Sequence, residues 1–144
     1  AITADGMQIS SVQRADTEPE FHECATESEY IQKLIQTARA SKEFKGTTAF
    51  VALDTETAAR TAQLLGDDSP TLIGEGDTLP NSGSILLTLP LAKGLEFDHV
   101  VIVDANKENF PETDLSRRRL YTAISRATST VSIFSNGELS PLLK

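Results

Sequence analysis

The sequence predicts an α/β domain built around a mainly parallel sheet. Short apolar runs alternate along the chain with segments of helical periodicity, and this alternation is typical of a sheet layered between helices. The runs at residues 85–89 and 100–103 are uninterrupted, as expected for strands that are buried on both faces. Such strands should be joined by right-handed crossovers. The expected strands are residues 7–13, 20–25, 47–53, 71–73, 85–89, 100–103 and 129–134.

Three helices are expected, and each begins after a residue whose side chain can accept a hydrogen bond from the first turn. The first follows a capping box of Thr26 and Glu29, and its apolar positions recur at three- and four-residue spacing. The expected N-caps and helices are Thr26 with residues 27–43, Asp54 or Thr55 with a helix that ends at Gly66, and Asp114 with residues 115–127. The expected connections are a turn at 14–19, a Gly- and Pro-rich loop at 67–84 and at most a helical turn at 139–143.

Length and cysteine content set the broad class of the protein. The 144 residues fit one domain, since a chain of this length buries roughly 68–70% of its unfolded surface. The single Cys24 cannot form an internal disulfide, which favours a reducing, cytoplasmic setting. No apolar stretch approaches the roughly 20 residues of a membrane span, so no membrane association is expected.

Charge is distributed unevenly along the chain. The net charge of −8 argues against a domain that coats nucleic acid on its own, because Lys and Arg supply most of the affinity for phosphates. Residues 1–89 hold 6 basic and 14 acidic side chains, whereas residues 90–144 hold 7 of each. The second half is therefore neutral overall, and a local phosphate site in it is compatible with the acidic whole.

A polar turn between the two buried runs is the first candidate site. It carries Lys93, Gly94 and Glu96, and the run at 85–89 points its carboxyl end at it, where open α/β sheets bind ligands. The lysine can reach a phosphate, the glycine permits a tight turn or a close approach, and the glutamate can accept hydrogen bonds from a ribose. A strand-connecting turn with solvated charges is the alternative interpretation.

A run of arginines in the third expected helix is the second candidate site. Arg119, Thr122 and Arg126 are spaced to share one face of that helix. A guanidinium on a rigid element can stabilise the charge that develops on a transferring phosphoryl group, an effect worth roughly 10³–10⁵ in rate. The alternative, that these arginines form a solvated basic face, stays open, above all for Arg117.

Other chemical signals in the chain are weak. The phosphate-binding pattern G-x-x-x-x-G-K-[ST] does not occur in the sequence, so the domain lacks a P-loop of its own. Residues 100–104 could pass for a Walker B strand, but an ordinary aspartate that closes a buried strand is the better interpretation. His22, His99 and Cys24 have no partners at metal-binding or catalytic spacing and are expected to be structural, so no metal ligands are assigned.

The order and spacing of the two clusters resemble a known family. Residues 88–98, TLPLAKGLEFD, are similar to motif V of superfamily 1 DNA helicases of the UvrD/Rep/PcrA type, and residues 117–127, RRRLYTAISRA, are similar to their motif VI. Asn109-Phe110-Pro111 also resembles the loop that links these motifs. The resemblance implies a three-layer RecA-like fold and the second, C-terminal motor domain of such an enzyme.

Roles for individual residues follow from this resemblance. It implies that Arg126 is the arginine finger, that Lys93, Gly94 and Glu96 contact the nucleotide, and that Thr88 lies near single-stranded DNA. ATP and Mg²⁺ would be shared with an N-terminal RecA-like domain, and this chain alone would be inactive. The short stretch 67–84 would replace the large accessory-domain insertion of UvrD.

Two other functions remain open at this point. The short 67–84 stretch is also similar to HelD-type helicases, which implies an ATPase that remodels RNA polymerase. A domain that keeps the fold, has lost the chemistry and serves only for interaction is the third hypothesis.

Overall fold

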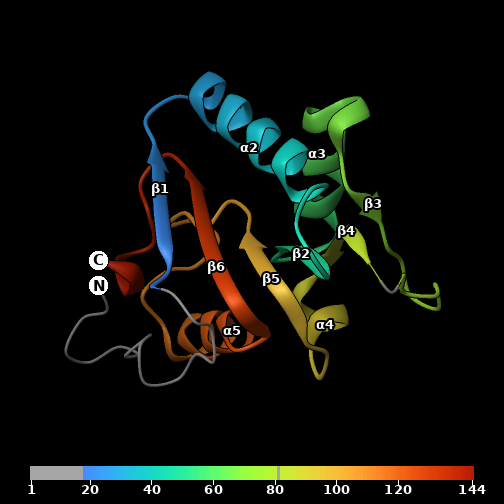
Figure 1. Ribbon diagram of the computed structural model, residues 1–144. Coiled ribbons are helices and arrows are strands. Elements are labelled where there is room, and N and C mark those ends of the chain that lie inside the picture. Colours follow the sequence, from blue (N-terminus) through green and yellow to red (C-terminus); the bar gives the residue numbers. More distant parts are fainter. Residues whose placement is uncertain (1–17, 81) are drawn as a thin grey trace.

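The computed structural model describes residues 18–80 and 82–144, in which six strands form one parallel sheet (Figure 1). The strand order is β1-β6-β5-β2-β4-β3. The strands are β1 (Glu20–Cys24), β2 (Thr47–Ala52), β3 (Thr71–Leu72), β4 (Gly83–Thr88), β5 (Phe97–Ile102) and β6 (Ala127–Asn136). The helices are α2 (Glu27–Ser41), α3 (Thr55–Leu65), α4 (Leu89–Ala92) and α5 (Asp114–Ile124), with 3-10 turns η1 (Gly66–Asp68) and η2 (Pro141–Leu143). The strand expected at 7–13 and most of the turn at 14–19 lie outside the described residues.

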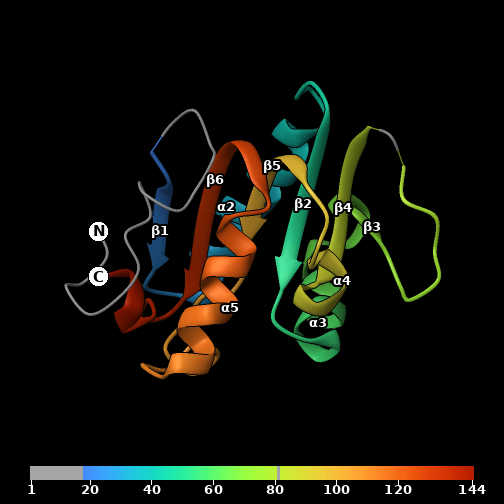
Figure 2. The ribbon, with the colours of Figure 1, turned by 90° about the horizontal axis from the view of Figure 1, so that it is seen from below.

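The sheet lies between two pairs of helices, which confirms the layered α/β fold (Figure 1, Figure 2). Helices α2 and α3 contact each other and cover one face, whereas α4 and α5 contact each other and cover the opposite face. Connections that run toward β3 use the first face, and connections that run toward β1 use the second. This exchange of faces is what crossovers of a single hand require.

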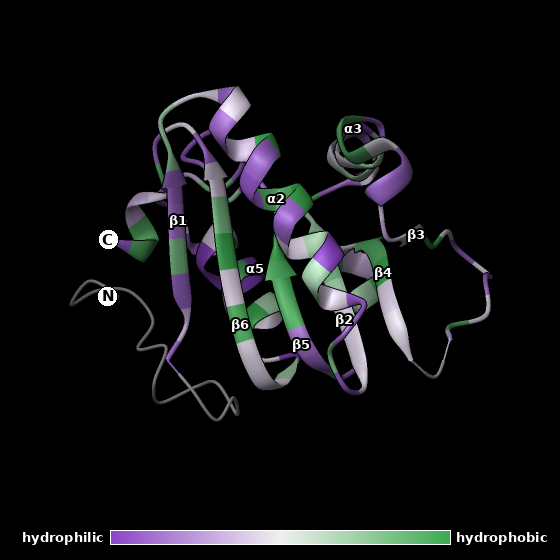
Figure 3. Cartoon of the chain, turned by 45° about the horizontal axis from the view of Figure 1, so that its top comes forward, coloured by the Kyte–Doolittle hydropathy of each residue, from purple (hydrophilic) through white to green (hydrophobic). Residues whose placement is uncertain are grey.

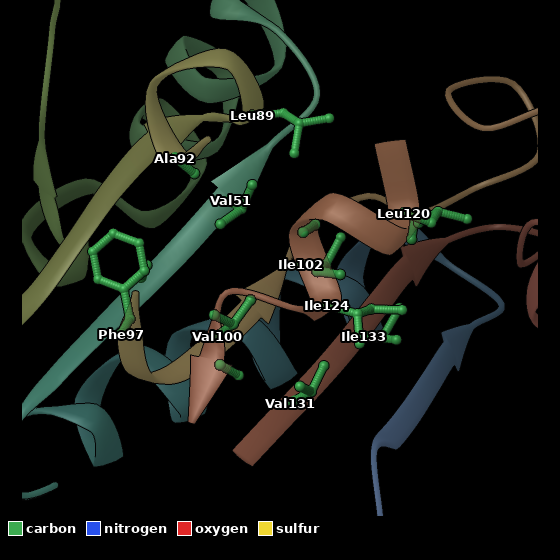
Figure 4. Close-up of a cluster of buried hydrophobic side chains, with 14 of the residues drawn as sticks. Val51, Leu89, Ala92, Phe97, Val100, Ile102, Leu120, Ile124, Val131 and Ile133 are labelled. Atoms are coloured by element: carbon green, nitrogen blue, oxygen red, sulfur yellow. The ribbon is translucent and has the colours of Figure 1, made fainter. Parts of the chain in front are cut away.

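Each face of the sheet has its own hydrophobic core. Beneath α2 and α3, Tyr30 and Leu34 pack against Phe50 and Leu86 of the central strands. Beneath α5, Leu120 and Ile124 pack against a row of branched residues on β5 and β6, as Figure 4 shows. Figure 3 shows the resulting pattern, with apolar residues along the central strands and polar residues on the outward sides of the helices. Within the described part of the chain, no helix is long and apolar enough to span a membrane.

Helix caps agree with most of the sequence-based expectations. The Thr26 hydroxyl accepts a hydrogen bond from the Glu29 N–H at 3.1 Å, and Glu29 in turn accepts one from the Ala25 N–H at 2.9 Å. Asp54 caps α3 by accepting from the Thr57 N–H at 2.8 Å, and Gly66 follows the end of the helix. These caps confirm the first two helices, and β3 lies within residues 67–84, where one short strand was expected. That this stretch replaces an accessory domain stays a prediction.

Several predicted boundaries are wrong, and each error has a local cause. The sequence predicts the end of a strand and a turn where the structure has helix α4. Pro90 is compatible with this helix because it lies in the first turn, where backbone N–H groups have no intrahelical partner. Thr113, not Asp114, is the N-cap of α5, because its hydroxyl accepts from the Ser116 N–H at 3.1 Å. Helix α5 ends at Ile124 rather than at residue 127. Strand β6 begins at residue 127, two residues before the expected start at 129.

Candidate functional site

The segment 88–96 crosses the sheet from one edge to the other. Thr88 lies at the carboxyl end of β4, and the four-residue helix α4 follows directly. Lys93 ends α4, Gly94 has a φ of +84°, and Glu96 directly precedes β5. The positive φ is a conformation that glycine adopts without strain. Since β4 and β5 run in the same direction, Thr88 and Glu96 lie at opposite edges of the sheet.

This geometry corrects the expected position of the polar turn. The carboxyl end of β4 points at Thr88 and α4, whereas Glu96 lies at the amino edge, next to the start of β5. The sequence pattern suggested a direct turn because the apolar residues of α4 continue the apolar run of β4.

Arg126 lies at the same amino edge, immediately before β6. Its carbonyl oxygen accepts a hydrogen bond from the Phe97 N–H at 2.8 Å, which ties the start of β5 to the start of β6. Glu96 and Arg126 therefore flank one point on the amino edge. The expectation that Arg126 shares the helix face of Arg119 and Thr122 is wrong, because α5 ends before it.

The guanidinium of Arg126 is partly withdrawn from water and has no counter-ion among the described residues. Its Nη2 donates to the Ser125 hydroxyl at 3.3 Å, but its buried Nε has no hydrogen-bond partner in residues 18–80 and 82–144. None of the described carboxylates lies within ion-pairing distance of it. An unpaired buried N–H costs about 1–3 kcal/mol. The group can therefore recover free energy by binding an anion.

A second carboxylate near the turn, Asp98, is structural. Its Oδ2 accepts from the Thr47 N–H at 2.8 Å and from the Thr47 hydroxyl at 3.4 Å, so it ties β5 to β2. The neighbouring Gly46 has a φ of +83°, and a Cβ at that position would overlap the Asp98 carboxylate. These contacts hold in place the edge at which Glu96 and Arg126 lie.

Lys93 faces a different environment from Glu96. It lines a groove of about 360 Å³ between α4 and α5, which we call the α4–α5 groove. The described residues that line it are Leu53, Leu89, Pro90, Lys93, Leu115, Arg118, Arg119 and Thr122. The groove gathers three cations, two of them from the arginine run. The structure thus separates the predicted nucleotide residues, with Lys93 in the groove and Glu96 at the amino edge.

Thr88 lies at the carboxyl edge beside a second groove. This groove has a volume of about 370 Å³, and Thr88 and Pro90 line it together with Thr55 and Gly74. Thr88 is half-buried, and its hydroxyl does not cap α4. A polar side chain is therefore available on the surface at the end of a central strand.

Asp104 at the end of β5 has a structural role that sequence reasoning did not find. Its φ of +52° is rare outside glycine, and its Oδ1 accepts from the Asn106 side chain at 2.7 Å and from the Asn136 N–H at 3.4 Å. Asn109 donates to its carbonyl oxygen at 2.9 Å. Burial raises the pKa of Asp104 above its usual value. The asparagines that follow the strand were the available signal for this network.

The histidines and the cysteine make structural contacts. His22 stacks on Phe134 with ring centroids 4.4 Å apart, and His99 lies 2.7 Å from the Thr130 hydroxyl. Cys24 is fully buried, and burial raises the pKa of its thiol. Among the residues that the structure describes, no three His, Cys, Asp or Glu side chains are placed to hold a metal ion together.

Comparison with known proteins adds evidence from outside the geometry. Residues 83–134 match the family described as UvrD-like helicase C-terminal domain, and this range includes both sequence clusters. No curated protein matches the chain.

Two solved structures are similar to this chain. The C-terminal domain of a possible DNA helicase from Lactobacillus strain WCFS1 is 27% identical, with a TM-score of 0.79 over 94% of this chain and 85% of that one. Methylated PRRSV nsp10, a helicase, is 14% identical, with a TM-score of 0.51 over 88% of this chain and 26% of that one, and it shows the fold alone. The family match over residues 83–134 and the first structural match together support a UvrD-like C-terminal domain.

Proposed function

We propose that this chain is the C-terminal motor domain of an ATP-dependent DNA helicase that acts in the cytoplasm. In this proposal Arg126 and Glu96 contact an ATP that a separate N-terminal RecA-like domain holds together with Mg²⁺. The observation that carries the proposal is the position of these two residues beside each other at one edge, joined through the Phe97–Arg126 backbone hydrogen bond.

Arg126 is suited to the role of an arginine finger. Charge develops on the phosphoryl oxygens as the γ-phosphate transfers, and a fixed guanidinium stabilises it. Arg126 lies between the end of α5 and the start of β6, so its backbone is held on both sides. Its unpaired Nε supports the assignment, since an anionic oxygen would supply the missing partner.

Glu96 and Gly94 would shape the rest of the nucleotide contact. Glu96 is exposed, and a carboxylate can accept hydrogen bonds from ribose hydroxyls. Gly94 is also exposed, and no atom lies within 4 Å of the position that a side chain would start from, so a ligand can approach its backbone. Lys93 would contact the nucleotide by extending its flexible side chain out of the α4–α5 groove.

Thr88 would contact single-stranded DNA at the opposite edge. The segment 88–96 would then connect the DNA contact with the nucleotide contact. ATP-driven closure of this domain on the N-terminal domain would shift that segment and alternate the grip on a single strand or on the tail of a duplex.

The decisive experiment changes Arg126 in the full-length protein. For Arg126→Ala we expect ATP turnover to fall by about 10³ or more, as for other arginine fingers, while ATP affinity changes little. Arg126→Lys should recover little of the turnover, because an ammonium does not reproduce the fork of a guanidinium. Turnover is measured by phosphate release with single-stranded DNA present, and affinity with a fluorescent ATP analogue.

A matched control excludes a general loss of structure. Arg39 is an exposed arginine on α2 that pairs with Asp68, so Arg39→Ala removes a guanidinium that has no part in the proposed site. Its turnover should equal that of the unmodified protein. Turnover of Arg126→Ala within a few-fold of this control would refute the finger role, and ATPase activity of the isolated chain would refute the shared nucleotide site.

The alternative functions have less support. No contact or surface in the described residues favours RNA polymerase as a partner. A domain without chemistry would not explain an arginine whose buried Nε lacks a hydrogen-bond partner among the described residues, at the position where the resemblance requires a finger.

A further inference from the structure

The cations of the α4–α5 groove differ from most others in the chain. Lys93, Arg118 and Arg119 have no carboxylate within ion-pairing distance in the part of the chain that the structure describes. Six other cations are paired, namely Lys33, Arg39, Arg60, Lys107, Arg117 and Lys144. In a chain with a net charge of −8, three unpaired cations around one groove indicate that the groove is shaped for negative charge.

The floor of the groove is aliphatic. Leu53, Leu89 and Pro90 line it, and Leu115 stands at its margin with 48% of its surface exposed. A large exposed aliphatic side chain beside unpaired cations offers a ligand both an apolar and a cationic contact. Asp54 is an acidic group that Arg119 influences, but its carboxylate already accepts a hydrogen bond from the Thr57 N–H, which lowers its pKa, and Arg119 lowers that pKa further.

This combination fits a peptide better than a nucleic acid. Proteins that bind single strands stack bases on aromatic side chains, and none of the described residues that line the groove is aromatic. Phosphates would satisfy the cations but would leave the exposed Leu115 without an apolar partner. A protein segment that alternates carboxylates with aliphatic side chains satisfies both, in the manner of an amphipathic helix bound in a groove.

We propose that the α4–α5 groove docks an acidic protein segment that carries aliphatic side chains. Its carboxylates pair with Arg118 and Arg119, and its leucine- or isoleucine-type side chains cover Leu115 and the groove floor. The groove lies on the face of the sheet, away from the Glu96–Arg126 pair, so this docking surface does not depend on the proposed ATP contact.

The test measures binding of a defined probe to the 144-residue chain. The probe is a fluorescein-labelled helical peptide with the repeat Glu-Leu-Leu-Glu, followed by fluorescence polarisation at low and high salt. We expect a Kd of about 10–100 μM at low salt, as for a small transient interface. Affinity should fall as salt rises, because the rim charges are exposed.

Two variants separate the charged from the apolar contribution. Arg118→Glu should weaken binding at least about tenfold, since it replaces attraction by repulsion at the rim. Its matched control is Lys45→Glu, the same charge change at an exposed, unpaired lysine outside the groove, which should leave the Kd within about twofold. Leu115→Ser should weaken binding by about tenfold through lost apolar burial. A probe peptide with serine in place of leucine should bind the unmodified chain as weakly as the original probe binds Leu115→Ser.

The remaining outcomes refute the proposal. Oligo-dT that displaces the peptide and binds Leu115→Ser unchanged would show that the groove is a phosphate site. Equal losses for Lys45→Glu and Arg118→Glu would show that only the overall charge attracts the peptide. Absence of binding at about 1 mM peptide, roughly the weakest affinity of a specific contact, would exclude the docking surface.

Discussion

The Asp98–Thr47 contact gives the sharpest prediction about how the amino edge is held. The change is Asp98→Ala, which removes the acceptor of the Thr47 N–H at 2.8 Å and of the Thr47 hydroxyl at 3.4 Å. Both groups lie at the start of β2, directly after Gly46.

The expected loss in the free energy of unfolding is about 1.5–3 kcal/mol, the range for a hydrogen bond to a charged group. Asp98 and Thr47 are only half-buried, so water can replace part of the contact and the lower half of the range applies. At about 3 °C per kcal/mol for a domain of this size, the melting temperature should fall by about 5 °C. Asp98→Asn should lose less, because its amide oxygen can still accept the short hydrogen bond.

Urea unfolding followed by circular dichroism measures the effect, and the m-value should stay constant. The control is Glu112→Ala, which removes an exposed carboxylate that has no hydrogen bond or ion pair to the rest of the described chain. Both variants change the net charge equally, so any difference reports the Thr47 contact. If Asp98→Ala unfolds within about 0.5 kcal/mol of this control, the amino edge is held by something other than Asp98.

Three further predictions concern stability. Burial raises the pKa of Asp104 above its usual value of 3.8, so the native state binds this proton more tightly than the unfolded state does. The free energy of unfolding should therefore fall as pH rises from 3.8 through the raised pKa. Asp104→Asn tolerates the positive φ and should remove this pH dependence from the midpoint of urea unfolding. Leu120→Ala should cost about 2–5 kcal/mol in urea unfolding, because the side chain is fully buried beneath α5, whereas Leu115→Ala on the same helix should cost far less. Thr113→Ala should cost about 1 kcal/mol as the loss of an N-cap, and Asp114→Ala, which lacks that role, should lower the melting temperature less.

The fold class was predictable because burial and capping both leave local signals. Leu86 and Leu87 are fully buried within an unbroken apolar run, and Thr26 and Asp54 accept the hydrogen bonds that their types predict. Strand ends were less predictable. β5 includes Asp98 and His99, which interrupt the apolar pattern but pair with Thr47 and Thr130 across neighbouring strands. Such partners are distant in sequence, so local periodicity does not reveal them.

The candidate site was predictable in its residues but not in its arrangement. Motif resemblance selected Glu96 and Arg126, and both lie at one edge. That they flank one point depends on β5 and β6 being neighbours in register, with Phe97 opposite residue 127. Strand order is set by packing over the whole sheet, and sequence spacing does not specify it. The same limit explains why Lys93 was grouped with Glu96, although α4 directs it to Arg118 and Arg119.

The short crossover between β4 and β5 gives the proposed function a physical basis. Most parallel connections use a helix of several turns, which can absorb a displacement at one end without moving the other. Here the crossover contains only α4 and the turn at Gly94, so little chain is available to absorb movement. A shift of Glu96 upon nucleotide contact would therefore reach Thr88 through a short segment. If the proposed roles of Glu96 and Thr88 are correct, the coupling between ATP and DNA needs no element beyond this crossover.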